Sequence, residues 1–140
     1  MFIKRKDKVV LTGINALVHN GISTSFETNL EILTDDMNLK GTTGYCYIEE
    51  LDLINFLQEK PIVDQVYVPT PERALIELIK HNLRYIDEGF FLEGMNMYVT
   101  SNKFNYDLLT KVASHFKVSK DSVDYWIKES KDYDSFILRG

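Results

Sequence analysis

The sequence lacks the residues on which several classes of protein depend. Its 140 residues include one cysteine, Cys46, which excludes an intramolecular disulfide and a cysteine-built metal cluster. No run of about 18 apolar residues occurs, so no segment is predicted to cross a membrane. No apolar stretch follows the charged N-terminus. A signal peptide is therefore not expected, and the protein is predicted to be cytoplasmic.

Positive charge is scarce beyond the first eight residues. Lys4, Arg5, Lys6 and Lys8 against Asp7 give that tip a charge of +3. Because the whole chain has a net charge of −5, the other 132 residues together carry −8. Because affinity for nucleic acid comes mostly from neutralised phosphates, this balance disfavours a body that wraps DNA. The basic tip is compatible with a nucleic-acid arm, although charged ends are more often simply solvated.

What remains is the composition of a globular protein, with 44% hydrophobic and 26% charged residues. Strands are predicted at 9–11, 25–33, 45–48 and 62–68, and the alternation in 25–33 indicates a half-buried strand. Helices are predicted at 13–20, 49–59, 70–80, 87–98, and after Asn105 and Ser119. The expected fold class is α/β (α+β), a small mixed sheet with packed helices. Residues 1–100 form this unit and 101–140 its helical C-terminal extension.

The clearest helix start lies at Thr70. Thr70 is a suitable N-cap, Pro71 stands where a missing N–H does no harm, and Glu72 favours the positive end of the helix dipole. Ala74 begins an apolar face that continues through Leu75, Leu78 and Ile79, with Glu77 and Lys80 predicted on the opposite, solvated face. Arg73 is expected to form an ion pair with the acidic segment that follows rather than to bind a substrate.

Candidate catalytic and metal-binding residues are few. His19, His81 and His115 fall on three separate predicted helices, so no metal site is expected. Asp87, Glu88 and Glu93 are an alternative carboxylate site for acid–base or metal chemistry. However, a helix N-terminus stabilises such residues without any chemistry. No cofactor and no catalytic residue are predicted.

Residues 109–128 have the pattern of a helix-turn-helix. Ala113 allows two helices to approach, and Ser119 can cap the second. Lys117 stands in the turn where glycine is usual, and the second helix carries a net charge of −1 despite Lys120. The pair is therefore interpreted as packing helices. A small DNA-binding transcriptional regulator, with Lys120 and the basic tip as contacts, is the alternative. The aromatic content also leaves a homo-oligomer open.

The segment 66–79, VYVPTPERALIELI, resembles the C-terminal domain of the AbiEi family of abortive-infection antitoxins. That family has a short strand, a proline or small residue, Pro-Glu-Arg-Ala and then an apolar helix. Looser similarity covers 13–21, 87–98 with Leu92-Glu93-Gly94, and 105–129.

This resemblance implies a non-enzymatic role in a type IV toxin–antitoxin system, opposing a nucleotidyltransferase-like toxin. Family members carry an N-terminal winged helix for DNA, which is not expected here because Met1 lies close to the first matched segment, 13–21. The residues carried over are Pro71, Glu72, Arg73 and Ala74. Their helix-capping, dipole and packing roles mark them as mainly architectural.

Overall fold

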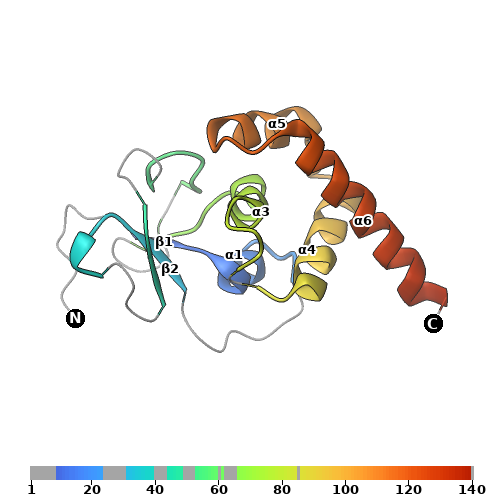
Figure 1. Ribbon diagram of the computed structural model, residues 1–140, viewed down its shortest axis with the longest axis horizontal. Helices are drawn as coiled ribbons and strands as arrows, with labels where there is room; N and C mark the ends of the chain where they lie inside the picture. Colours follow the sequence, from blue (N-terminus) through green and yellow to red (C-terminus); the bar gives the residue numbers. More distant parts are fainter. Residues whose placement is uncertain are drawn as a thin grey trace.

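The protein combines a small mixed sheet with a helical C-terminal region, which confirms the predicted α/β class (Figure 1). The computed structural model describes residues 9–23, 31–39, 44–48, 53–59, 61, 66–84 and 86–139. The strands are β1 (Val9–Leu11), β2 (Ile32–Thr34), β3 (Tyr45–Tyr47) and β4 (Val66–Tyr67). The helices are α1 (Gly13–His19), α3 (Pro71–Lys80), α4 (Glu88–Thr100), α5 (Tyr106–His115) and α6 (Lys120–Arg139), and a 3-10 turn covers Met37–Leu39. No helix in these ranges is long and apolar enough to span a bilayer.

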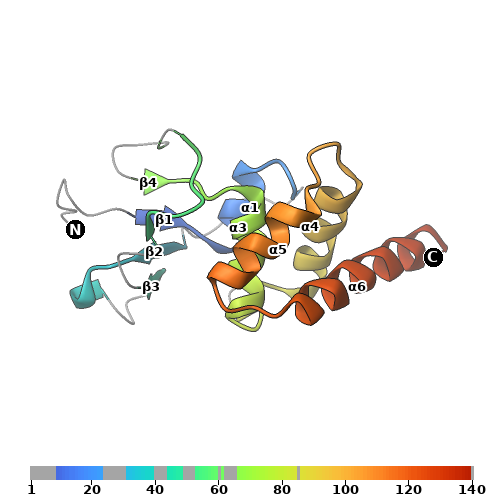
Figure 2. The ribbon, with the colours of Figure 1, turned by 90° about the horizontal axis from the view of Figure 1, so that it is seen from above.

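Strands β1 and β2 are the inner strands of the sheet, whose order is β3-β2-β1-β4. Strand β1 pairs antiparallel with β2, placing Val10 opposite Leu33, and parallel with β4, placing Val10 opposite Tyr67. Strand β3 runs parallel to β2. Figure 2 shows the sheet at one end of the molecule and the helices at the other. Between β1 and its parallel neighbour β4, the chain forms α1 in the helical layer and then returns to the sheet as β2 and β3.

Strand β2, which begins within the predicted strand 25–33 and ends one residue beyond it, is buried on both faces, whereas Glu31 just before it is half-buried. Ile32, Leu33 and Thr34 are each at most 3% exposed. The reason is a second small core in which Leu53 packs on Val10 and Leu33, away from the main core. A strand covered on two faces shows no polar side. Residues 25–30 of that prediction lie outside the described residues. The same holds for 62–65 of the predicted strand 62–68, whose later part contains β4.

The predicted helix at 49–59 is wrong for residues 54–59, and 49–52 lie outside the described part. Phe56 has a φ of +58°, which ends any helix, and Leu57 forms an antiparallel bridge with Pro69. The Gln58 amide donates to the Val68 carbonyl at 2.9 Å. This segment pairs with the chain that leaves β4, so its backbone donors and acceptors are satisfied across the fold instead of within a helix.

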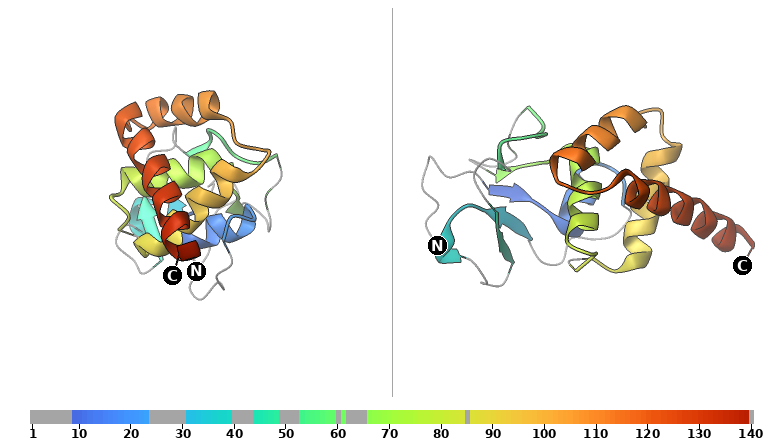
Figure 3. Two further views of the ribbon diagram at one scale, coloured as in Figure 1. Left: turned by 90° about the vertical axis from the view of Figure 1, so that its right-hand side faces the viewer. Right: turned by 45° about the horizontal axis from the view of Figure 1, so that its top comes forward.

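Helix α3 lies at the centre of the helical layer and contacts α1, α4 and α5. Every residue from Glu72 to Ile79 is buried, while Lys80 is exposed. The expectation that Glu77 faces solvent is therefore wrong, since it is only 2% exposed. Helix α6 runs along α4 (Figure 3). Its Trp126 ring meets Phe91 edge-on at 5.2 Å. The main core joins α3 to α5 and α6 through Leu109, Val112, Ala113, Phe116 and Val123.

Three helices end with the same hydrogen-bond pattern. After α1, α3 and α5, one amide donates to a carbonyl five residues back and the preceding amide to a carbonyl three residues back. This Schellman motif requires a left-handed residue, and here that residue is Gly21 (φ +72°), Asn82 (φ +56°) or Lys117 (φ +61°). The sequence predicts the stop at Asn20-Gly21. Lys117 adopts the glycine-like conformation that its place in the turn demands.

Because a Cβ is disfavoured in that conformation, we expect Lys117→Gly to raise the free energy of unfolding by about 0.5–1 kcal/mol. Urea unfolding followed by circular dichroism measures the change. Lys117→Ala removes the same charge but keeps the Cβ, so it should bring no such gain. Equal stabilisation by both variants would contradict the backbone explanation.

Gly94 lies where α4 passes closest to α1. A Cβ there would stand 3.1 Å from the Ile22 carbonyl oxygen and 3.1 Å from Leu17 Cδ1, and Leu17 is fully buried. Since a backbone atom cannot yield easily, Gly94→Ala should lower the free energy of unfolding by about 1–2 kcal/mol, despite its better helix propensity.

Gly89→Ala on the same helix is the matched control. Its Cβ would meet only the exposed Asp87 carboxylate at 3.1 Å and the Tyr133 hydroxyl at 3.7 Å. A change within about 0.5 kcal/mol is expected there, measured by the same denaturation. If Gly94→Ala were as stable as the wild type, the close approach of α4 to α1 would not constrain this position.

Candidate functional site

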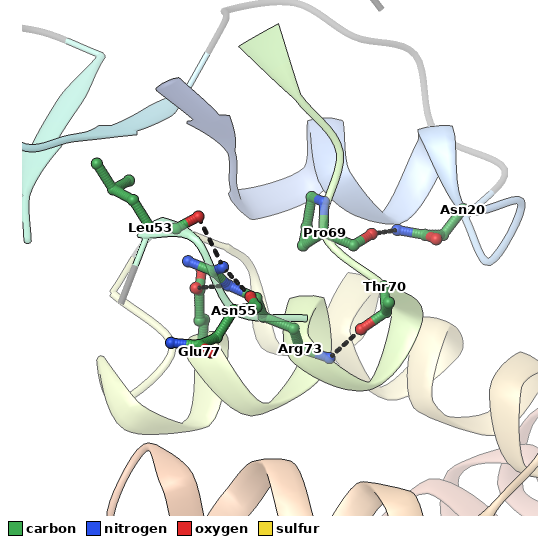
Figure 4. Close-up of polar contacts among 7 residues, drawn as sticks. All are labelled: Asn20, Leu53, Asn55, Pro69, Thr70, Arg73 and Glu77. Carbon is green, nitrogen blue, oxygen red and sulfur yellow. Dashed lines mark hydrogen bonds and ion pairs between the residues drawn. The ribbon is translucent and has the colours of Figure 1, made fainter. Parts of the chain in front are cut away.

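The residues matched to the family motif open helix α3. The Thr70 hydroxyl accepts a hydrogen bond from the Arg73 amide at 3.4 Å, and Pro71 is the first helical residue, as predicted. The Thr70 amide in turn donates to the Phe56 carbonyl at 2.9 Å. Nearby, the Asn20 side chain donates to the Pro69 carbonyl at 3.0 Å (Figure 4). The start of α3 is thus tied to two other segments of the chain.

Arg73 is fully buried and lies among acceptors from two elements. Its Nε donates to Glu77 Oε1 at 2.5 Å, one turn along α3. Its Nη1 donates to the backbone carbonyls of Leu53, at 3.3 Å, and of Asn55 (Figure 4). The Phe116 ring of the turn after α5 lies 5.3 Å from the guanidinium carbon. These five residues are called the Arg73 cluster below.

The Arg73 cluster corrects one expectation. Arg73 was expected to pair with the acidic segment that follows, but its partner is Glu77 of the same helix. The spacing of four residues is that of an ion pair on one helix face, so the pair was visible in the sequence. The two carbonyl acceptors were not visible, because they lie on a segment predicted to be a helix and some twenty residues earlier. Being 0% exposed, Arg73 meets no ligand directly.

Glu72 joins α3 to α4. It is 5% exposed, and its Oε2 accepts a hydrogen bond from the Tyr98 hydroxyl at 2.6 Å. The same hydroxyl accepts from the Asn105 amide at 3.1 Å, just before α5. Burial, and then the bond to Glu72, raises the pKa of Tyr98 well above its usual range, so the phenol stays protonated. Ala74, 2% exposed, lets neighbouring elements pack closely on α3.

The candidate acidic site does not assemble. Asp87 is the N-cap of α4 and accepts from the Gly89 amide at 2.8 Å, while Glu88 is an exposed residue of the first helical turn. In the described ranges, no three histidine, cysteine or acidic residues are grouped closely enough to hold a metal ion.

The three histidines stand at the ends of different helices, α1, α3 and α5. Burial, with Lys80 and Arg84 nearby, lowers the pKa of His81, so this imidazole is predominantly neutral at pH 7. The His115 ring meets Phe56 edge-on at 5.3 Å and Phe116 at 4.8 Å, so it packs beside the Arg73 cluster.

The predicted helix-turn-helix residues form α5, its turn and α6. Ala113 is 1% and Val123 0% exposed, and the Asn96 amide group donates to the Ser130 carbonyl at 3.3 Å, joining α4 to α6. One side of α6 is therefore engaged in packing. Lys120 is exposed, with its ammonium 5.8 Å from the centre of the Tyr106 ring. The other candidate nucleic-acid contacts, Lys4, Arg5 and Lys6, lie outside the described residues.

No family model matches the sequence, and no curated protein is significantly similar to it.

We expect Arg73→Met to lower the free energy of unfolding by about 3–5 kcal/mol, because it leaves the buried Glu77 carboxylate without its cation. Urea denaturation measures the loss. The double variant Arg73→Met/Glu77→Met should be more stable than the single one, since no lone charge then stays buried. A single variant within about 1 kcal/mol of the wild type would show that the cluster does not hold the fold.

Proposed function

We propose that the chain is an antitoxin-like module of a type IV toxin–antitoxin system, which opposes a nucleotidyltransferase-like toxin without catalysing a reaction. The sequence resemblance at 66–79 supports this proposal. The observation that carries it is that the matched residues Pro71, Glu72, Arg73 and Ala74 lie together at the start of the central helix. Their capping, dipole and packing roles there agree with a domain whose matched motif is architectural and whose function depends on other residues.

Recognition in such a module depends on its surface. Arg73, Ala74 and Glu72 are at most 5% exposed, so a toxin or a shared target would meet other residues. The helical end, with α5, α6 and the turns between helices, offers many exposed side chains on rigid elements among the described residues. The module would act there through contact with the toxin or through competition for its target.

Co-expression tests the proposal. A nucleotidyltransferase-like toxin encoded beside this gene should arrest growth when expressed alone, and the chain should restore it. Arg73→Met should weaken the rescue by lowering the amount of folded protein, whereas Lys117→Gly, which leaves the core intact, should keep it. Absence of rescue by the well-folded wild-type chain would refute the proposal.

A small DNA-binding regulator is the second candidate, and the arrangement of α5 and α6 as two helices joined by a short turn favours it. The charge of α6 works against it. Its lysines are outnumbered by Asp121, Asp124, Glu129 and Asp132 in the turns that would flank a DNA groove. Tight, salt-sensitive binding to random duplex DNA that is lost in Lys120→Glu would favour this candidate over the antitoxin.

A further inference from the structure

A groove of about 400 Å³ opens between the start of α5 and the outer side of α6. Phe104, Tyr106 and Ile127 form its apolar floor, and Lys128 and Lys131 stand at its edge, beside Asp124. The α6 residues 124, 127, 128 and 131 have the spacing of one helix face. We call this site the lysine groove.

The lysine groove is suited to an acidic, apolar occupant. The Tyr106 hydroxyl donates to Asp124 Oδ1 at 2.6 Å, so this carboxylate is already engaged inside the groove. That bond raises the pKa of Tyr106 to about 12, so the phenol remains a donor at neutral pH. Lys128 and Lys131 are exposed and form no ion pair with another described residue. The lysine groove therefore places two ammonium groups, available for an anionic partner, beside aromatic and aliphatic side chains.

The same chain displays a surface of the complementary kind. Phe90, in the first turns of α4, is 44% exposed and so presents an aromatic ring to solvent. Asp87 and Glu88 precede it and are both exposed. The Asp87 carboxylate caps α4, which fixes the start of the helix and so the position of the ring. We call Asp87, Glu88 and Phe90 the acidic knob.

We propose that two copies of this chain associate, with the acidic knob of one copy seated in the lysine groove of the other. The Phe90 ring supplies an aromatic anchor for a floor that is itself largely aromatic. The two carboxylates of the knob match the two ammonium groups of the groove in number and sign. This interaction is separate from the proposed antitoxin function, because it involves no toxin.

The acidic knob and the lysine groove are different surfaces of one chain, so each copy can both offer a knob and receive one. If a two-fold axis relates two copies, each knob enters the other copy's groove and the contact is made twice. A closed dimer is then expected, and its paired contacts strengthen one another. The charge pairs lie at the rim of the contact, so added salt should weaken the association.

Sedimentation velocity over a range of protein concentrations tests the proposal. The wild-type chain should shift from monomer to dimer with a dissociation constant in the micromolar range, on the order of that of other small, partly polar interfaces. Phe90→Ser, and separately Lys128→Glu/Lys131→Glu, should each weaken the dimer at least tenfold, roughly the effect of losing an anchor. Circular dichroism confirms that these surface variants are folded.

Met37→Ser is the matched control. Met37 is 61% exposed and, like Phe90, follows acidic residues, but it belongs to neither proposed surface. This variant should dimerise as the wild type does. A monomeric wild-type chain at every concentration would overturn the proposal, as would a dimer that both contact variants leave intact.

Mixing the variants gives the sharpest outcome. Phe90→Ser keeps an intact groove, and the double lysine variant keeps an intact knob. Their mixture should therefore form a 1:1 complex with one intact contact, which binds more tightly than either variant binds itself but less tightly than the wild-type dimer with two contacts. A mixture that associates no more tightly than the separate variants, although the wild type dimerises, would refute the pairing of knob with groove.

Discussion

The arrangement of α3, the segment at 53–57 and the turn after α5 depends on the burial of the Arg73 guanidinium. A charge removed from water is costly unless its donors find acceptors and an opposite charge lies close by. Glu77 supplies the charge and accepts from Nε, the carbonyls of Leu53 and Asn55 accept from Nη1, and Phe116 closes one side, while Nη2 has no hydrogen-bond partner among the described residues. The segment at 53–57 must therefore lie across α3, which brings Leu53 onto the sheet and Leu57 beside Pro69. One side chain thus connects the small sheet core to the helical core.

A second polar connection gives the helical layer its order. Glu72, Tyr98 and the Asn105 amide form a continuous set of hydrogen bonds from α3 through α4 to the start of α5. Helix α4 can pack against α1 only because position 94 has no side chain. Glu72, Arg73 and Ala74 of α3 and Leu92 and Gly94 of α4 all lie in the interior of the fold.

The exposed lysines of α6 are the surface feature that suits this chain to binding a partner. The chain is acidic beyond its first eight residues, yet Lys128 and Lys131 face the same groove on α6 without a described carboxylate partner. Helix α6 is well placed to display them, because its opposite side is fixed on α4 through Val123, Trp126 and Ser130. A rigid helix with one packed and one charged face suits recognition by contact, both for an antitoxin-like module and for self-association.

The sequence by itself determined the features whose partners are neighbours along the chain. The cap at Thr70, Pro71 at the first helical position and the stop at Asn20-Gly21 all follow from bonds spanning a few residues, so local pattern predicts them. Tertiary structure alone decided that Glu77 is buried and that residues 54–59 are not helical. Glu77 is buried because its partner, the Arg73 guanidinium, is enclosed by the fold. Residues 54–59 are not helical because they bond to the chain beside β4, as the Gln58 amide does to the Val68 carbonyl. Distant parts of the chain create both situations. An acidic residue such as Glu77, or the helical spacing of apolar residues at 49–59, is the same in the sequence whether or not the fold supplies such a partner.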